Sequence, residues 1–474
     1  MIRIFIIICL IQLTLLACGP DCYDTNKSQK LEDFLNKKWK NDLIFNTNYQ
    51  DIKSHYHGLG HSDDSVRTFK LDWMSHLKIT DNLGLTSTLR VINKENKSNF
   101  YDKYGTGNDL NMIGSRDFNE IYFRALYLTY ILPEINDYQH MFAFGTMPFQ
   151  GGSFNNYKTG RPQEANGLSM LFDMPFDAIT YVADISKLTN MDFFQIRVGY
   201  GEYMKFRKAY PQDETIASTP YGTTISFINF DMKQDNNIFK IEAYQTNWIF
   251  EDINIGTINA LGFGYAYDRL NDEGYVMYGT VGIMQGIGSY NSYISNKLNE
   301  NRDKLIEGYV QAGYPRDIAT GYVDKNLSNI TPEFVSQTTN LTIDDTGLNV
   351  GDKTTGWAFE IGAKKEFWWE EFDIYPYVGF EYFRSSKDWV STTLRGFHRN
   401  GIDPLIKGEA IDLYTGIKFD NNKNLTLSWI HENRKWSPSA INDVVGINTT
   451  QTNRNILTSR DIIRLDFTWM FLGL

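Results

Sequence analysis

The chain has 474 residues, enough for about three ordinary domains or one large barrel at the usual ~150 residues per domain. Hydrophobic residues (42%) and aromatic residues (15%) are too abundant for an intrinsically disordered chain, and a net charge of −11 without any Lys/Arg-rich run argues against a nucleic-acid partner. After the first 17 residues no apolar run approaches the ~20 residues of a membrane-spanning helix. The mean hydropathy of −0.39 is that of a soluble protein, but the aromatic content is high for a soluble domain.

Residues 1–17 have the pattern of an export signal peptide. Arg3 precedes an apolar stretch from Ile4 to Leu16, which suits a signal sequence but is too short to span a bilayer as a helix. Residues 15–18 (LLAC) resemble the lipobox of bacterial lipoproteins, in which the cysteine is acylated and becomes the mature N-terminus. The resemblance implies lipidation of Cys18; cleavage of a plain signal peptide nearby is the alternative.

Residues 18–42 are charged, with apolar side chains at near-helical spacing, and we interpret them as a periplasmic tether with a helical turn or two.

From residue 43 onward the pattern has a period of two. In the stretch 67–80, Phe69, Leu71 and Trp73 point one way while Lys70 and Asp72 point the other.

The same alternation predicts about sixteen strands. They are 43–55, 66–80, 83–94, 119–132, 138–148, 177–185, 191–203, 223–234, 238–250, 257–268, 275–288, 355–367, 373–385, 410–419, 425–434 and 461–474. Short, turn-rich connections alternate with long polar ones, which is typical of an up-and-down transmembrane barrel with tight periplasmic turns and long external loops. We therefore predict an all-β fold in which residues 43–474 form one antiparallel barrel.

A barrel accounts for the composition because a closed sheet pairs every backbone group, and only alternate side chains then have to face lipid. The predicted interfacial girdle consists of Tyr and Trp near strand ends: Tyr122, Tyr130, Trp248, Tyr275, Trp357, Trp368, Trp369, Trp429 and Trp469.

The strand number and the amphipathic last strand resemble those of bacterial porins, and the layout resembles an uncharacterised family of porin-like outer-membrane barrels. In porins the loop after the fifth strand enters the lumen and opens with Pro, Phe and Gly-Gly; residues 148–152 (PFQGG) are similar in content. The C-terminal residues 471–474 (FLGL) depart from the usual terminal aromatic. The resemblance implies diffusion of small solutes or ions, contact with outer-membrane lipids, and a homotrimer as a candidate assembly.

The predicted constriction combines the loop 149–169 with charges on the wall. The loop contributes Lys158, Arg161 and Glu164, and the alternation places Lys70, Lys78, Arg90, Arg197, Arg464, Asp72, Glu360 and Glu381 on the lumenal face. Fixed charges at such a constriction set ion preference. In the alternative interpretation the loop lies over the mouth of the barrel and its charges are solvated.

Two histidine-containing stretches are candidates for a chemical role. His55, His57 and His61 with Asp63 suggest a polar external loop, a transition-metal site or a hydrolytic site, in descending order of preference. His431 lies six residues before Ser437. An outer-membrane phospholipase uses the same residue types, but its motif is absent from this sequence. We therefore predict no metal, no cofactor and no enzymatic activity.

The sequence as a whole predicts a porin-like channel in the outer membrane of a Gram-negative bacterium. The alternatives are a surface-exposed lipoprotein of β-sandwich form that binds a glycan or host ligand, and a barrel hydrolase.

Overall fold

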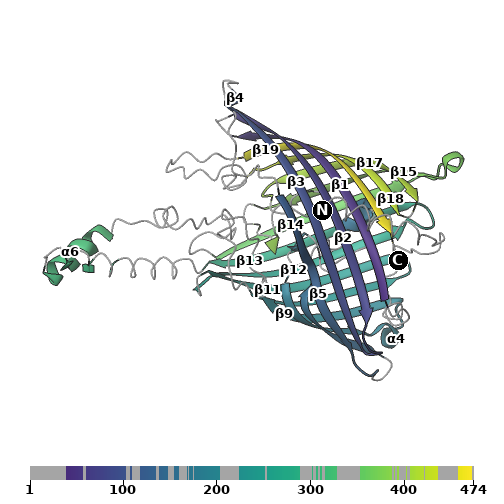
Figure 1. The fold of residues 1–474 in the computed structure, drawn as a ribbon, viewed down its shortest axis with the longest axis horizontal. Coiled ribbons are helices and arrows are strands. Elements are labelled where there is room, and N and C mark those ends of the chain that lie inside the picture. Colours follow the sequence, from purple (N-terminus) through teal and green to yellow (C-terminus); the bar gives the residue numbers. More distant parts are fainter. Residues whose placement is uncertain are drawn as a thin grey trace, which may run out of the picture.

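Long alternating strands close into a single barrel in the computed structural model (Figure 1). The residues that the structure describes are 39–56, 60–102, 107–108, 118–134, 138–147, 154–159, 168, 170–173, 176–202, 224–250, 253–288, 302, 306–307, 310–311, 315–327, 353–386, 389, 392–393, 402, 406–420, 422–435 and 457–471. The predicted signal peptide, Cys18 and most of the tether therefore lie outside the described residues.

The barrel wall consists of sixteen strands. They are β1 (Trp39–Tyr56), β2 (Gly60–Lys78), β3 (Leu83–Asp102), β5 (Phe118–Ile131), β6 (Gln139–Met147), β8 (Phe176–Asp184), β9 (Phe193–Glu202), β10 (Thr224–Gln234), β11 (Asn237–Phe250), β12 (Ile253–Arg269), β13 (Tyr275–Gly288), β14 (Lys353–Glu366), β15 (Tyr375–Ser385), β17 (Glu409–Asp420), β18 (Lys423–Asn433) and β19 (Leu457–Phe471). The shorter elements are β4 (Gly107–Asn108), β7 (Phe172–Asp173), β16 (Thr392–Thr393), α3 (Asn155–Thr159), α4 (Ser186–Thr189), α6 (Arg316–Leu327) and η3 (Glu370–Phe372).

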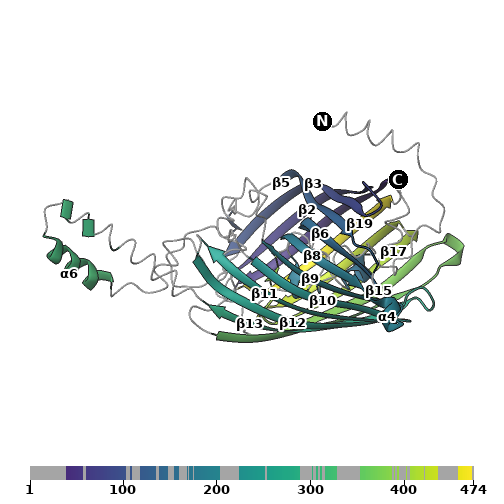
Figure 2. The ribbon, with the colours of Figure 1, turned by 90° about the horizontal axis from the view of Figure 1, so that it is seen from below.

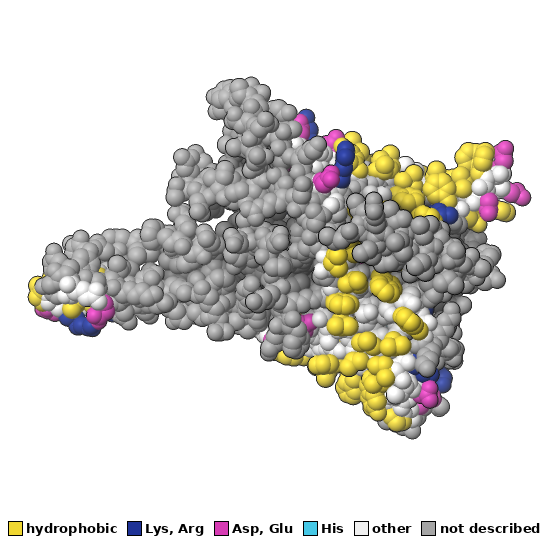
Figure 3. Space-filling view, viewed as in Figure 1, with side chains coloured by type: hydrophobic (Ala, Val, Ile, Leu, Met, Phe, Trp, Pro, Cys, Tyr) yellow, Lys and Arg dark blue, Asp and Glu magenta, His cyan; other side chains and the backbone are white. Residues whose placement is uncertain are grey.

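Side chains on this wall are distributed in the reverse of the soluble pattern. On β2, Lys70 and Asp72 are buried, whereas Trp73, the residue after Asp72, is 43% exposed. The same holds on β19, where Arg464 is buried and Ile463 is exposed. Figure 3 shows hydrophobic side chains over the visible outer wall, with charged ones toward its two ends. An apolar outer face and a polar inner face are what a sheet needs when it separates lipid from a wet interior.

Closure of the sheet comes from the first and last strands. β1 pairs antiparallel with β2 on one side and with β19 on the other, in a register that runs from Leu43↔Phe471 to Tyr56↔Leu457. Each neighbouring pair of wall strands is antiparallel. Because a closed sheet leaves no unpaired edge, its backbone can lie in hydrocarbon. This closure rules out the two-sheet sandwich for these strands.

Connections at the two ends of the barrel differ in length. At one end β2 and β3 are joined by residues 79–82, and β10 and β11 by two residues, the first of which, Asp235, has a φ of 54° in a tight turn. At the other end the connections include 103–117 and 289–352. Figure 2 shows α4 and the short hairpins together at one end. Short turns at one end and long connections at the other are the arrangement expected of an up-and-down transmembrane barrel.

None of the helices in the described part of the chain is long and apolar enough to cross a membrane.

All sixteen predicted segments correspond to wall strands, but several strands are longer than predicted. β1 begins at Trp39, inside the range assigned to the tether, and β2 begins at Gly60 and not at 66. Both extensions pair continuously, with Trp39 opposite Leu77 and Gly60 opposite Asp102. Backbone pairing tolerates polar side chains, so a strand continues beyond the apolar alternation that revealed it.

Candidate functional site: the inserted segment and the lumenal wall

The connection between β6 and β8 folds into the barrel and packs against the inner wall. Its described part includes helix α3 and residues 168 and 170–173. Phe154 and Tyr157 are buried, and their rings stack with that of Tyr278 on β13 at centroid distances of 5.7 and 5.5 Å. We call residues 154–159, 168 and 170–173 the inserted segment.

Polar contacts bind α3 to three wall strands. Lys158, only 1% exposed, forms an ion pair with Asp412 on β17. The Tyr157 hydroxyl donates to Asp268 Oδ2 on β12 at 3.1 Å, and Lys364 Nζ on β14 donates to the Tyr157 carbonyl oxygen at 3.0 Å. A buried ion pair in a low-dielectric site is costly to break on one side. These contacts therefore fix the position of α3 on the wall.

The later part of the inserted segment is held by β11. The Leu168 amide donates to Glu242 Oε2 at 2.5 Å, and the Tyr244 hydroxyl donates to the Leu171 carbonyl oxygen at 2.7 Å. Further along, β7 pairs in parallel with β16 from the connection between β15 and β17. Buried apolar residues from both connections join one cluster with the wall: Phe154, Tyr157, Leu168, Met170, Leu171, Trp389, Ile402 and Ile406.

Glycines on the facing wall make room for this segment. A Cβ on Gly262 would overlap Leu171, and one on Gly264 would approach Leu168 Cδ2 to 2.7 Å. A Cβ on Gly282 would lie 2.5 Å from Leu171 Cδ2. These inward-facing positions on β12 and β13 are thus shaped to receive the inserted segment.

Another part of the wall carries paired charges. Arg90 on β3 makes a bidentate pair with Asp72 on β2, with Nε and Nη2 lying 2.6 and 2.7 Å from the two carboxylate oxygens. Lys70, two residues from Asp72 on the same strand face, is also buried. Bidentate pairing fixes the guanidinium plane. The structure thus brings together the predicted wall residues Lys70, Asp72 and Arg90.

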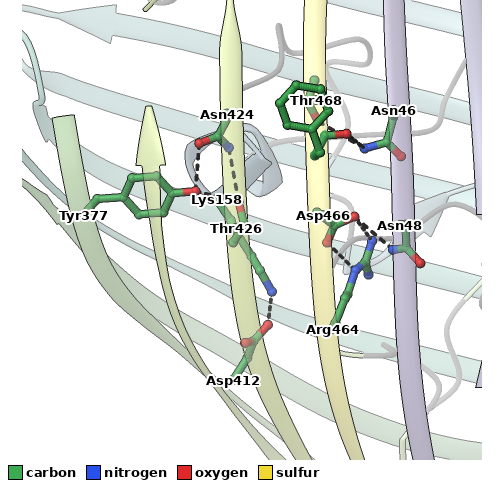
Figure 4. Close-up of polar contacts among 11 residues, drawn as sticks. Asn46, Asn48, Lys158, Tyr377, Asp412, Asn424, Thr426, Arg464, Asp466 and Thr468 are labelled. Atoms are coloured by element: carbon green, nitrogen blue, oxygen red, sulfur yellow. Dashed lines mark hydrogen bonds and ion pairs between the residues drawn. The ribbon is translucent and has the colours of Figure 1, made fainter. Parts of the chain in front are cut away.

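A polar stretch runs from β1 across β19 and β18 (Figure 4). Arg464 Nη2 and Asn48 Nδ2 both donate to Asp466 Oδ1 at 2.9 Å, and Asn46 Nδ2 donates to Thr468 Oγ1 at 3.1 Å. Figure 4 shows Lys158 reaching from α3 to Asp412 over the neighbouring strands of the same wall. The inserted segment therefore borders this stretch.

The remaining predicted site residues occupy separate places. Lys78 lies at the turn end, where its Nζ is 2.8 Å from Asp81 Oδ1; this hydrogen bond and the Lys78 charge lower the pKa of the exposed Asp81 carboxyl. Arg197 on β9 donates to Asn229 Oδ1 at 3.1 Å and lies 3.6 Å from Asp231 Oδ2. Arg161 and Glu164 lie outside the described residues.

Three of the candidate histidines, His55, His61 and His431, lie on the outer face of the wall. His55 and His61 are in β1 and β2, directly opposite each other, with ring centroids 6.0 Å apart, and not in a loop as predicted. His57 and Ser437 lie outside the described residues. His431 Nδ1 on β18 is 2.8 Å from Asp461 Oδ1 on β19. Within the described ranges no group of three or more metal-ligating side chains is placed to hold a metal ion.

Sequence reasoning missed the wall residues that hold the inserted segment, among them Asp268, Asp412, Glu242 and Tyr244. Each occupies an inward position of an alternating strand, so the alternation identifies the face on which it lies. No local pattern indicates which of these side chains contacts a segment up to 254 residues away along the chain.

No protein-family model matches the chain, and no curated protein matches it. Solved structures to which it is similar include outer-membrane expressed OmpT of Vibrio cholerae, with 10% identity and a TM-score of 0.43 over 92% of this chain and 99% of that one. An anion-selective porin from Comamonas acidovorans has 9% identity and a TM-score of 0.42 over 91% and 99% of the two chains. The low-pH structure of OprB from Pseudomonas putida has 7% identity and a TM-score of 0.44 over 95% and 100%. At these identities the likeness concerns the fold alone.

Proposed function

We propose that this chain is an outer-membrane channel through which small solutes or ions diffuse, without covalent chemistry. The observation that carries the proposal is the wall itself, which is apolar outside, polar inside and closed by pairing of β1 with β19. A closed wall of this kind encloses a polar path between its loop end and its turn end.

The inserted segment gives the proposed path its narrowest part. It covers the wall from β11 to β17, while Lys70, Asp72 and Arg90 line the wall at β2 and β3. Because Lys158 is buried against Asp412, we propose that it holds the constriction in place. We propose that the combined charge of Lys70, Arg90 and Asp72 on the wall sets the field that a passing ion meets. Lys78 at the turn end and Arg197 on β9 would act on ions before or after this point.

Planar-bilayer recording from refolded protein tests the channel. Discrete conductance steps are expected, with a size that depends on salt concentration. If heat-modifiable gel migration confirms a folded barrel and no steps appear at any salt concentration, the proposal is wrong.

We also propose that the mature protein begins at an acylated Cys18 and that barrels assemble as homotrimers in outer-membrane lipid. An N-terminal acyl anchor is compatible with the position of β1, whose first residues lie at the turn end next to the end of β19. Native mass measurement of the assembly, released from its detergent or lipid carrier in the gas phase, would distinguish one copy of the chain from three.

A further inference from the structure

The connection between β14 and β15 differs from the other short connections at the turn end. Residues 367–373 (FWWEEFD) are all exposed, and they include four large aromatic side chains: Phe367 (49%), Trp368 (63%), Trp369 (50%) and Phe372 (57%). Among the described residues, the other short connections carry at most one exposed large apolar side chain each, such as Leu188 in α4. We call residues 367–373 the aromatic tip.

The aromatic tip projects beyond the neighbouring hairpins. On one side, the pairing of β13 with β14 ends at Tyr275↔Lys365, two residues before the tip begins at Phe367. On the other side, the neighbouring hairpin turns at residues 421–422, between β17 and β18. Figure 1 shows the hairpin between β14 and β15 extending past the other turns at this end, and Figure 3 shows hydrophobic and acidic side chains gathered on this projection.

An outward pair of a lysine and a tyrosine lies just before the tip. Lys365 Nζ lies 5.7 Å from the centroid of the Tyr275 ring, a combination typical of the headgroup region. At about 3.3 Å per residue, the tip begins roughly 7 Å beyond Lys365 along the strand and continues away from the barrel. The tip therefore lies beyond the pair of Lys365 and Tyr275, at the end of the barrel that carries the short turns.

The tip is also held in one conformation. Trp369 N donates to the Ile374 carbonyl oxygen at 2.9 Å, Phe372 N donates to the Trp369 carbonyl oxygen at 3.2 Å, and Asp373 closes the turn with a φ of 48°. The rings of Trp369 and Phe372 pack edge to face at 4.9 Å. An ordered aromatic surface loses little conformational entropy on binding.

Three carboxylates accompany these aromatic rings: Glu370, Glu371 and Asp373, all exposed. We propose that the aromatic tip is a docking site for a periplasmic protein that presents a basic, apolar-lined groove. Charge complementarity selects this occupant, since Lys and Arg pair with the carboxylates and also bind aromatic faces. Acidic lipid headgroups would be repelled, and a second barrel beside this one would present the same acidic tip.

The size of the tip indicates a transient complex. Four aromatic side chains of 150–250 Å² each, about half exposed, offer roughly 400 Å² of apolar surface. That is about half of the ~800 Å² that each partner buries in a stable interface.

Photocrosslinking in intact cells tests the proposal on the full chain. A benzoylphenylalanine residue is placed at position 369, and in a control at position 188, which is exposed and apolar at the same end of the barrel. The expected product at position 369 is one adduct with a periplasmic protein, with Lys or Arg in the crosslinked peptide found by mass spectrometry. The control gives no such adduct.

Charge variants complete the test. Glu370→Lys with Glu371→Lys is expected to lower the adduct yield at least tenfold, and the Glu370→Gln/Glu371→Gln variant to lower it less; heat-modifiable migration confirms that each barrel is folded. Adducts only with lipid, adducts with a second copy of this chain, no adduct, or a protein adduct that is insensitive to charge reversal would each overturn the proposal.

Discussion

The ion pair between Lys158 and Asp412 predicts how the inserted segment responds to mutation. Asp412→Asn leaves the Lys158 ammonium buried beside a neutral amide, and removing one partner of a buried pair costs about 3–5 kcal/mol. Four other described hydrogen bonds hold the segment: from Tyr157 to Asp268, from Lys364 to the Tyr157 carbonyl oxygen, from Leu168 to Glu242, and from Tyr244 to Leu171. At about 1–2 kcal/mol each they contribute about 4–8 kcal/mol in total.

The loss from Asp412→Asn is therefore more than half of the contribution of the polar contacts that remain. A change of about 4 kcal/mol shifts the ratio of attached to detached segment by about 10³-fold, since 1.4 kcal/mol corresponds to a factor of ten. Single-channel recording measures this ratio as the time spent at two current levels. We expect Asp412→Asn and Lys158→Met each to add a higher, fluctuating level to the wild-type current.

The double variant Lys158→Met/Asp412→Asn provides the control. It buries no unpaired charge, so it should recover most of the wild-type behaviour, with a coupling of about 2–3 kcal/mol between the two sites. The reasoning is refuted if both single variants, with folded barrels confirmed by gel migration, give the wild-type current level and noise.

Three further predictions concern the wall and the N-terminus. Gly262→Ala should displace the inserted segment because its Cβ overlaps Leu171, and should change the conductance, whereas Gly279→Ala, whose Cβ comes no closer than 3.3 Å to a neighbour, should not. Arg90→Gln should move the reversal potential in a salt gradient toward cation preference and Asp72→Asn toward anion preference, by similar amounts; equal potentials in both variants would show that ions do not pass this pair. Cys18→Ser should abolish incorporation of labelled palmitate, and a variant that still incorporates label would place the acyl chain elsewhere.

The barrel was predictable because its signal is repeated along every strand. The alternation of Phe69, Leu71 and Trp73 with Lys70 and Asp72 assigns each side chain to a face without knowledge of its partners. Strand ends were less predictable, since polar residues such as Ser62 continue the pairing after the alternation ends.

The site was predictable only in part, for a related physical reason. Alternation placed Lys70, Arg90 and Arg464 on the inner face, and all three are buried there. The pairing of Lys158 with Asp412 depends on the path of a connection through the lumen, which no periodic pattern encodes. The projection of the hairpin that carries Trp369 was likewise hidden, because the residue types of a strand end do not indicate how far its hairpin extends past its neighbours.

Closure by the chain ends has a consequence for biogenesis. The first wall strand pairs with the last across more than four hundred residues, as in Leu43↔Phe471, whereas the other wall pairs join strands that are neighbours in sequence. Hairpins can therefore form early at a low loop-closure cost, but the seam between β1 and β19 can form only after the whole polypeptide has been delivered. Until then both edges expose unpaired amides, which hydrocarbon does not tolerate. An intermediate lacking β19 thus has no stable place in the bilayer until the seam closes.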